Sequence, residues 1–151
     1  MRIALVTDAW LPQVNGVVRT LGHTIREATA AGHEVSVISP ADFRTIPCPT
    51  YPEIRLSLFP GRSVRRRLEE LRPDAVHVAT EGPLGLAARN WCVRHDWPFT
   101  TAYHTQFPEY VRARVPIPLG LGYAAVRWFH SRARRTLVTT PSMVRQLEAR
   151  G

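Results

Sequence analysis

Lysine is absent from this chain, and all twenty of its basic residues are arginine, against twelve acidic residues. The absence excludes a P-loop nucleotide site, because that motif depends on a lysine that reaches the phosphates. A formal net charge of +8 still favours anionic partners such as phosphate groups, anionic lipid or nucleic acid. We expect no nucleic-acid partner, since the sequence has no helix-turn-helix, zinc-finger or aromatic RNA-binding pattern.

Cysteine and long apolar stretches are also scarce. Cys48 and Cys92 are too few for a disulfide framework, and they lack the CxxC spacing of a redox or zinc site. No apolar run is long enough to cross a bilayer, and Met1-Arg2 leads into a strand-like segment rather than a signal peptide. We therefore expect a reduced protein of the cytoplasm.

Several cofactor and catalytic signatures are missing as well. The first predicted strand is not followed by G-x-G-x-x-G, which disfavours an NAD or FAD site. No G-x-S-x-G turn supports an α/β-hydrolase. The six histidines show no metal-ligand spacing, so we expect no metal site.

The sequence alternates between short β-branched runs and amphipathic segments. The first unit is a strand over 2–7, a loop that ends in Asn15-Gly16, and a helix that ends near Gly32. Further strands are expected at 34–39, 54–58, 75–78, 99–103 and 136–139, and helices at 63–71, 81–95, 119–132 and from Pro141. The proline-rich stretch 40–52 is expected to be a loop. This alternation predicts one α/β domain over residues 1–151, built on a doubly wound parallel sheet.

Polar residues follow several of the predicted strands. Asn15-Gly16 comes after the first strand, Glu81-Gly82 after the fourth, and His104-Thr105 after the fifth. Because parallel strands end at the same edge of a sheet, these residues should meet in one crevice, where anions bind helix N–H groups. A purely structural role stays open for two of these residues. Glu81 can interact favourably with the dipole at a helix N-terminus, and His104 can cap or order the loop in which it lies.

A basic segment surrounds the predicted helix 63–71, with arginines at Arg62, Arg65, Arg66 and Arg67. It is either a solvated amphipathic helix or a surface that docks on anionic lipid, at roughly 1 kcal/mol per arginine that reaches the membrane. A second segment, 119–129, is apolar almost all round. We expect this segment to be buried in the fold, and the alternative is that one side faces an acceptor or a further domain.

Several segments together carry a family resemblance: RIALVTDAWLPQVNGVVRTL, AGHEVSVISP, PDAVHVATEGPLG, FTTAYHTQFPEYV and TTPSMVRQL. The chain resembles the N-terminal domain of retaining glycosyltransferases of the GT-B fold, family 4. Within that family it is similar to the branch of GDP-mannose-dependent α-mannosyltransferases and sulfoquinovosyl-diacylglycerol synthases. The resemblance implies a Rossmann-like N-terminal half, and it covers essentially the whole chain.

The resemblance also implies roles for particular residues. Asn15, Gly16 and Val17 match the loop that approaches the donor diphosphate. His104 matches the histidine near the donor sugar and the reaction centre. Glu81 and Gly82, with Thr105, match the acceptor side.

The implied activity is transfer of a hexose, mannose-like or related, from a GDP- or UDP-linked sugar to a lipid or glycan acceptor with retention. The resemblance implies no metal and no further cofactor, and it is compatible with peripheral attachment to a membrane. In such enzymes the E-x7-E signature lies in a C-terminal donor-binding domain that is absent from residues 1–151, so we expect this chain alone to be inactive. Two other classes stay open: a non-catalytic lipid- or sugar-binding module, and a small nucleotide-binding regulator.

Overall fold

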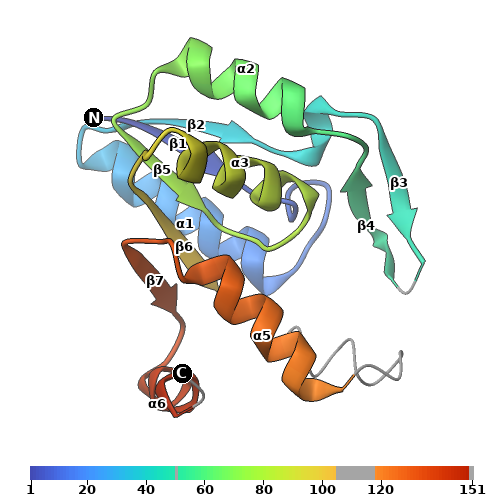
Figure 1. Cartoon of the computed structure of the whole chain (residues 1–151). Helices are drawn as coiled ribbons and strands as arrows, with labels where there is room; N and C mark the ends of the chain where they lie inside the picture. The colour runs from blue at the N-terminus through green and yellow to red at the C-terminus, as the bar shows by residue number, and fades with distance from the viewer. Residues whose placement is uncertain (50, 105–117, 150–151) are drawn as a thin grey trace.

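The computed structural model describes residues 1–49, 51–104 and 118–149. Its centre is a five-stranded sheet in the order β2-β1-β5-β6-β7 (Figure 1). The strands are β1 (Arg2–Val6), β2 (Glu34–Ile38), β5 (Ala75–Val78), β6 (Phe99–Tyr103) and β7 (Arg135–Val138). All neighbouring pairs in this sheet are parallel, which confirms the predicted architecture.

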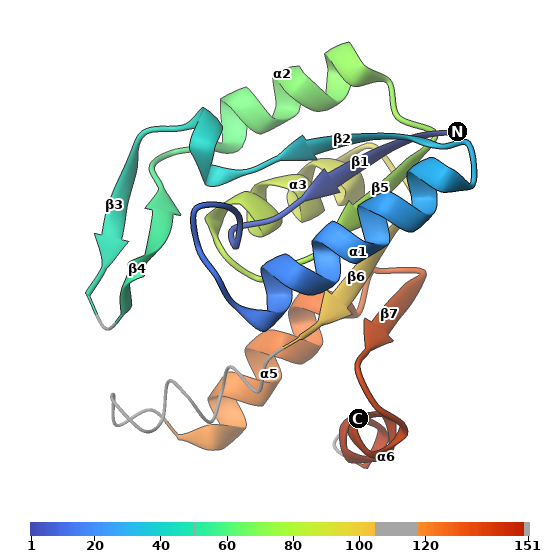
Figure 2. The ribbon, with the colours of Figure 1, turned by 180° about the vertical axis from the view of Figure 1, so that it is seen from behind.

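Helices cover both faces of the sheet. Helix α1 (Gly16–Ala30) lies on one face, as Figure 2 shows, and α2 (Gly61–Leu71) and α3 (Pro83–Arg94) lie on the other. Helices α5 (Leu119–His130) and α6 (Pro141–Glu148) flank the β6–β7 side of the sheet. The β-branched run of β1 is buried because apolar side chains cover it from both faces.

Two clusters of buried side chains correspond to these two faces. Leu5 of β1 packs with Leu21 of α1 and with Ala79, and Val17 and Ile25 of α1 lie against the same cluster. The larger cluster lies on the other side of the sheet, and its members include Val6, Val64, Leu68, Val78, Leu84, Trp91 and Phe129. The sheet is therefore held between two apolar layers, which leaves its carboxyl edge as the place for polar loops.

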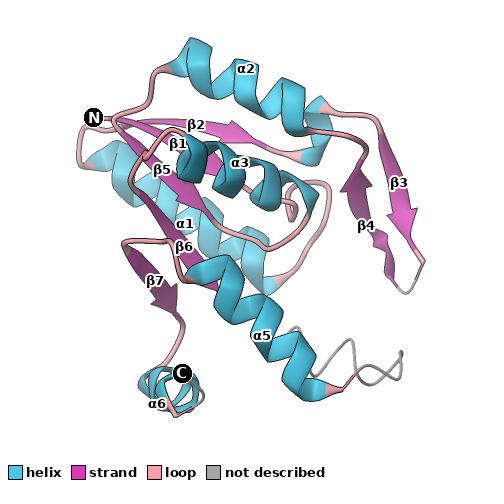
Figure 3. Cartoon of the chain, in the orientation of Figure 1, coloured by secondary structure: helices cyan, strands magenta, loops and turns pink. Residues whose placement is uncertain are grey.

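The stretch after β2 departs from our expectation. We predicted a loop over 40–52 and a sheet strand over 54–58, but the chain forms a 3-10 helix η1 (Pro40–Asp42) and a separate antiparallel hairpin. The hairpin strands, β3 (Thr45–Cys48) and β4 (Tyr51–Ser57), project from the body of the molecule (Figure 3). Pro47 and Pro52 lack an N–H group, and a two-stranded hairpin tolerates them because each strand has one unpaired edge.

Helix α5 is also different from our expectation of burial in the fold. Phe129 is buried, but Leu121 is 63% exposed and Trp128 is 53% exposed. The side of α5 that carries Leu121 and Trp128 is therefore largely exposed, and burial of this helix is limited to the side that carries Phe129. In the described part of the chain, no helix has the length and apolar character needed to span a membrane.

Candidate functional site

The carboxyl ends of β1 and β5 meet around the carboxylate of Asp8, which is 5% exposed. Asp8 Oδ1 accepts the N–H of Leu84 at 2.8 Å, and Oδ2 accepts the N–H of Gly85 at 3.2 Å. The Thr80 hydroxyl donates to Oδ2 at 2.8 Å. Because Gly82 has no side chain with which to cap α3, Asp8 supplies that cap from another strand end.

The electrostatics of Asp8 follow from this position. Burial raises the pKa of Asp8, while the hydrogen bonds from Leu84, Thr80 and Gly85 act in the opposite direction. The nearby charge of Glu81 adds to the upward shift. The amino end of α3 is thus already occupied by a carboxylate of the protein itself.

Two glycines let α3 come this close to β1 and β5. A Cβ atom at Gly82 would overlap the carboxylate of Asp8, and one at Gly85 would overlap the backbone carbonyl of Thr80. We predicted Gly82 as an acceptor-side residue, and this packing gives it a structural reason of its own.

The amino end of α1 is built differently. Asn15 caps it, because Asn15 Oδ1 accepts the N–H of Val18 at 3.0 Å and Asn15 Nδ2 donates to Gln13 Oε1 at 3.2 Å. The first turn of α1 contains no acidic side chain. A Cβ atom at Gly16 would meet no described atom within 4 Å, so the space beside it is open. The Val17 side chain packs against the core, which leaves its backbone as the part that can reach a ligand.

Glu81 lies in the loop before α3 and pairs with a histidine from a distant helix. His130 Nε2 is 3.2 Å from Glu81 Oε1, and His130 Nδ1 is 2.8 Å from the hydroxyl oxygen of Thr101. The Thr101 hydroxyl is in turn 2.9 Å from that of Thr136. These contacts join the ends of β5 and α5 to two neighbouring strands, β6 and β7.

His104 directly follows β6. Its Nε2 atom is buried and has no hydrogen-bond partner among the residues that the structure describes. Burial lowers the pKa of His104, and the negative charge of Glu81 acts in the opposite direction. The ring is therefore mainly neutral near pH 7, and it can donate one hydrogen bond and accept another.

His77 lies on β5, beside β6. Its Nδ1 is 2.9 Å from the hydroxyl oxygen of Thr100, its register partner. Burial lowers the pKa of His77 to about 4, with a smaller contribution from His104. This ring is a neutral part of the sheet interior rather than a proton donor to a ligand.

The structure brings some of the predicted site residues together and leaves others apart. Glu81 acts electrostatically on both Asp8 and His104, so these groups form one cluster at the carboxyl edge. Asn15 and Gly16 lie at the amino end of α1, at the same edge of the sheet. Thr105 lies outside the described residues.

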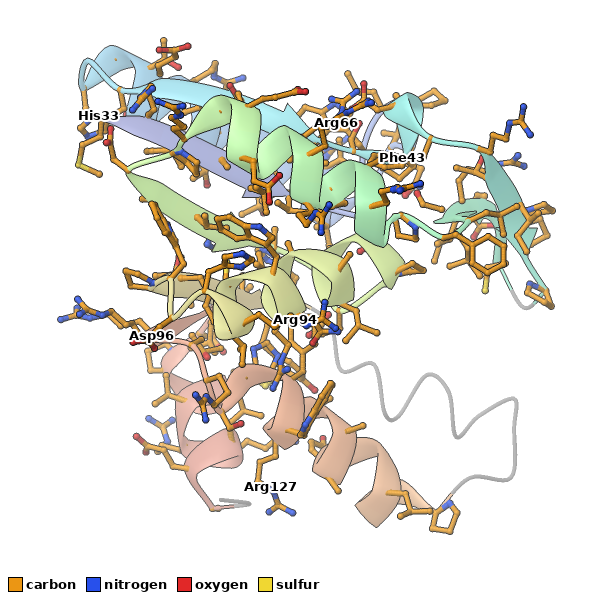
Figure 4. The ribbon with its side chains drawn as sticks, turned by 45° about the horizontal axis from the view of Figure 1, so that its top comes forward. His33, Phe43, Arg66, Arg94, Asp96 and Arg127 are labelled. Atoms are coloured by element: carbon orange, nitrogen blue, oxygen red, sulfur yellow. The ribbon has the colours of Figure 1, made fainter. Side chains whose placement is uncertain are left out.

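The four predicted membrane-facing arginines lie on α2, and most are ion-paired. Arg65 Nε is 3.7 Å from Glu69 Oε1, Arg66 Nε is 3.6 Å from Glu70 Oε1, and Arg67 Nη2 is 3.2 Å from Asp42 Oδ1. The guanidinium of Arg67 also lies 5.8 Å from the ring centre of Phe43. Figure 4 labels Phe43 and the neighbouring helix residue Arg66. Arg62 has no ion pair among the described residues.

Sequence reasoning missed Asp8, Thr101 and His130. Asp8 directly follows the first strand, a position that could have suggested it. Nothing local to Thr101 or His130 indicates their contacts, because their partners are far away in sequence. Within the described part of the chain, no cluster of three or more His, Cys, Asp or Glu side chains could hold a metal ion.

Comparison with known proteins gives a consistent family. Residues 14–151 match the family model described as Glycosyltransferase Family 4. The chain is 28% identical to a GDP-mannose-dependent alpha-mannosyltransferase of Mycobacterium tuberculosis (strain CDC 1551 / Oshkosh), with 100% of this chain and 45% of the relative covered. It is 32% identical to an alpha-monoglucosyldiacylglycerol synthase of Acholeplasma laidlawii, with 73% of this chain and 31% of the relative covered.

A plant protein extends the comparison. The chain is 27% identical to the sulfoquinovosyl transferase SQD2 of Arabidopsis thaliana, with 99% of this chain and 32% of the relative covered. The chain therefore spans less than half the length of these relatives. Because the family model matches most of its length, this chain belongs to glycosyltransferase family 4.

Proposed function

We propose that this chain is the acceptor-side half of an enzyme that transfers a hexose from a nucleotide sugar to a lipid or glycan acceptor, with retention. The observation that carries the proposal is the carboxyl edge of the sheet. There the amino end of α1 with its uncharged cap, the buried Nε2 of His104 and the carboxylate of Glu81 follow neighbouring strands of the sheet. Ligands of open α/β sheets bind at this edge.

The donor diphosphate fits the amino end of α1 better than that of α3. Both helix ends carry partial positive charge, but at α3 the N–H groups of Leu84 and Gly85 are already bonded to Asp8. At α1 the cap is the uncharged Asn15, and Gly16 leaves room for phosphate oxygens to approach the backbone. We propose that Asn15, Gly16 and the backbone of Val17 contact the diphosphate of a GDP- or UDP-linked sugar.

His104 is the proposed catalytic residue. Its Nε2, which has no partner among the described residues, and its lowered pKa suit a neutral ring that hydrogen-bonds the donor sugar as charge develops in the transition state. The diphosphate is already a good leaving group, so positioning and stabilisation of charge account for the rate, and we propose no cofactor besides the nucleotide sugar. Glu81, Gly82 and Thr105 are proposed to line the acceptor side.

The rest of the donor site is proposed to lie outside this chain. The relatives are more than twice as long as the part that this chain matches. We propose that a C-terminal domain binds most of the nucleotide and closes the site over His104, so residues 1–151 alone do not catalyse transfer.

A sugar-transfer assay with the full-length protein that contains this chain tests the proposal. We expect the protein to move radiolabelled hexose from GDP-mannose, or from another GDP- or UDP-linked hexose, to a lipid or glycan acceptor. NMR of the product should show the anomeric configuration of the donor. Binding of the sugar nucleotide without any transfer would instead indicate a binding module, and the isolated chain serves as the inactive control.

We also propose that the enzyme works at an anionic membrane surface. The Acholeplasma laidlawii relative is named for a lipid product, and the amino end of α2 offers both charge and apolar area. Phe59 is 96% exposed and lies three residues before Arg62, the arginine of this helix that has no ion pair in the described part of the chain. The ion pairs of Arg65, Arg66 and Arg67 reduce what those residues add.

Vesicle co-sedimentation tests the membrane proposal. The full-length protein should bind phosphatidylcholine vesicles only when phosphatidylglycerol is included, and high salt should release it. Arg62→Ala should weaken binding about fivefold, the equivalent of roughly 1 kcal/mol. Phe59→Ser should act in the same direction, while Arg94→Ala on α3 is the exposed-arginine control. Equal binding by all variants would contradict this surface.

A further inference from the structure

We infer that His130 is a positioning residue for the reaction: it holds the carboxylate of Glu81 in place to accept a hydrogen bond from the acceptor hydroxyl. The inference rests on the proposed function and extends it to a residue outside the strand-end loops. His130 is the last residue of α5, and it reaches across to the loop that follows β5.

The contacts of His130 leave little freedom to its ring. Its side chain is 11% exposed, and that of Glu81 is 23% exposed. One ring nitrogen is 3.2 Å from Glu81 Oε1, and the other is 2.8 Å from the Thr101 hydroxyl. The ring also meets Phe129 and Tyr103 edge to face, with centres 5.2 Å and 6.0 Å apart. These contacts fix the direction in which Nε2 points.

The chemistry of the groups fixes the direction of the hydrogen bonds when the ring is neutral. An ionised carboxylate only accepts, so His130 Nε2 must carry the hydrogen that it donates to Glu81. His130 Nδ1 then accepts from the Thr101 hydroxyl, whose oxygen is left to accept from Thr136. The sequence of donors therefore runs from Thr136 through Thr101 and His130 and ends on Glu81.

Capping of helix α3 does not explain the position of Glu81. The first N–H groups of α3 are already bonded to Asp8, so Glu81 is not the cap of that helix. His130 engages Oε1 alone, and Oε2 has no hydrogen-bond partner among the described residues. The charge of Glu81 reaches His104, the proposed catalytic residue. A carboxylate that His130 holds by one oxygen, and whose charge reaches His104, can accept a hydrogen bond from an acceptor hydroxyl through its other oxygen.

The substitutions His130→Asn and His130→Gln distinguish a role of His130 in positioning Glu81 from a role in packing alone. Asn at 130 can replace the bond to Thr101 but is too short to reach Glu81, whereas Gln can extend toward Glu81. In the full-length enzyme, His130→Asn should raise the acceptor KM about tenfold and leave the donor KM unchanged. His130→Gln should recover part of the loss. His23→Asn, at an exposed histidine of α1, is the matched control.

A double-mutant cycle tests whether His130 acts through Glu81. In a Glu81→Ala background, His130→Asn should have no further effect on the acceptor KM. Additive effects, or an unchanged acceptor KM in His130→Asn, would overturn the inference. So would a uniform fall in activity that only follows the folded fraction.

An NMR titration keeps the inference testable apart from the proposed function. If the wild-type protein transfers no hexose, the proposed function fails, but the His104 ring still reports on Glu81. His130→Asn should lower the pKa of His104, because a loosened carboxylate stabilises the charged ring less. An unchanged His104 titration would overturn the positioning role of His130. The His104→Gln spectrum assigns the resonance.

Discussion

Single residues at the carboxyl edge of the sheet carry the functional argument, and each has neighbours that define its role. His104 has a buried ring nitrogen without a partner in the described part of the chain, whereas His77 uses its Nδ1 on Thr100. Asp8 caps α3, whereas Glu81 does not bond to the helix and contacts His130 instead. Residues of the same type therefore differ in what remains free to bind a ligand.

Replacement of His104 tests the catalytic assignment. His104→Ala should lower kcat by about 10²–10³-fold in the full-length enzyme, the equivalent of roughly 2.7–4 kcal/mol, because one preorganised hydrogen bond is lost. Steady-state kinetics and thermal unfolding should be measured on the same preparation. A lower Tm with a nearly normal kcat would show that His104 only orders its loop.

Replacement of Gly16 tests the donor site. In Gly16→Leu, the new side chain would project into the open space at the amino end of α1, where the diphosphate is proposed to approach. We expect turnover to fall strongly and the donor KM to rise, while the Tm changes little because no described atom is displaced. Unchanged donor KM and kcat would show that the loop is only a turn.

At the scale of the elements, the site depends on how closely α3 docks against the ends of β1 and β5. Gly85 lies against the backbone of Thr80, and Gly82 lies against Asp8. These contacts bring the first turn of α3 onto the Asp8 carboxylate. They also leave Glu81 in the preceding loop, since α3 begins at Pro83.

Alanine substitutions at two helical glycines measure this docking. Gly85→Ala should destabilise the fold by several kcal/mol, because its Cβ overlaps a backbone carbonyl that cannot move aside cheaply. Gly22→Ala is the control in α1, where the Cβ has open space and should stabilise the helix by about 0.8–1 kcal/mol. Chemical denaturation gives both values, and equal stability of the two variants would contradict the close approach.

For the whole molecule, the lowered pKa of His77 predicts loss of stability in mild acid. Burial lowers this pKa to about 4 from an unfolded value near 6.5, so the unfolded chain takes up the proton first. The free energy of unfolding is therefore highest, as far as His77 is concerned, above pH 6.5, and it decreases as the pH falls from 6.5 toward 4. The full size of this decrease is on the order of 3 kcal/mol.

Urea unfolding at several pH values measures this effect. Between pH 7 and pH 4, His77→Gln should lose less stability than the wild type, because the variant has no proton to take up at this position. His23→Gln, at an exposed position on α1, should follow the wild-type curve. Parallel curves for His77→Gln and the wild type would show that His77 does not govern the acid response.

The sequence by itself determined most of the local structure and the family. The β-branched run of β1 and the amphipathic period of α1 depend on residues that are close together, so they could be predicted. The cap by Asn15 is equally local, but we did not predict it. The resemblance to family 4 also came from contiguous segments, and the family model confirms it. The parallel architecture of the sheet followed from the alternation of strands and helices, but the order of its strands did not.

Only the tertiary structure decided which polar groups meet. Asp8 caps a helix that begins 75 residues later, and His130 reaches Glu81 across 49 positions of sequence. The strands β3 and β4 pair with each other and not with the central sheet. The composition of a strand does not decide which neighbour it pairs with, so this could not be predicted from residues 54–58. Local sequence patterns indicate the conformation that residues close together in the chain favour. These contacts depend instead on the strand order β2-β1-β5-β6-β7, which places segments that are distant in sequence side by side.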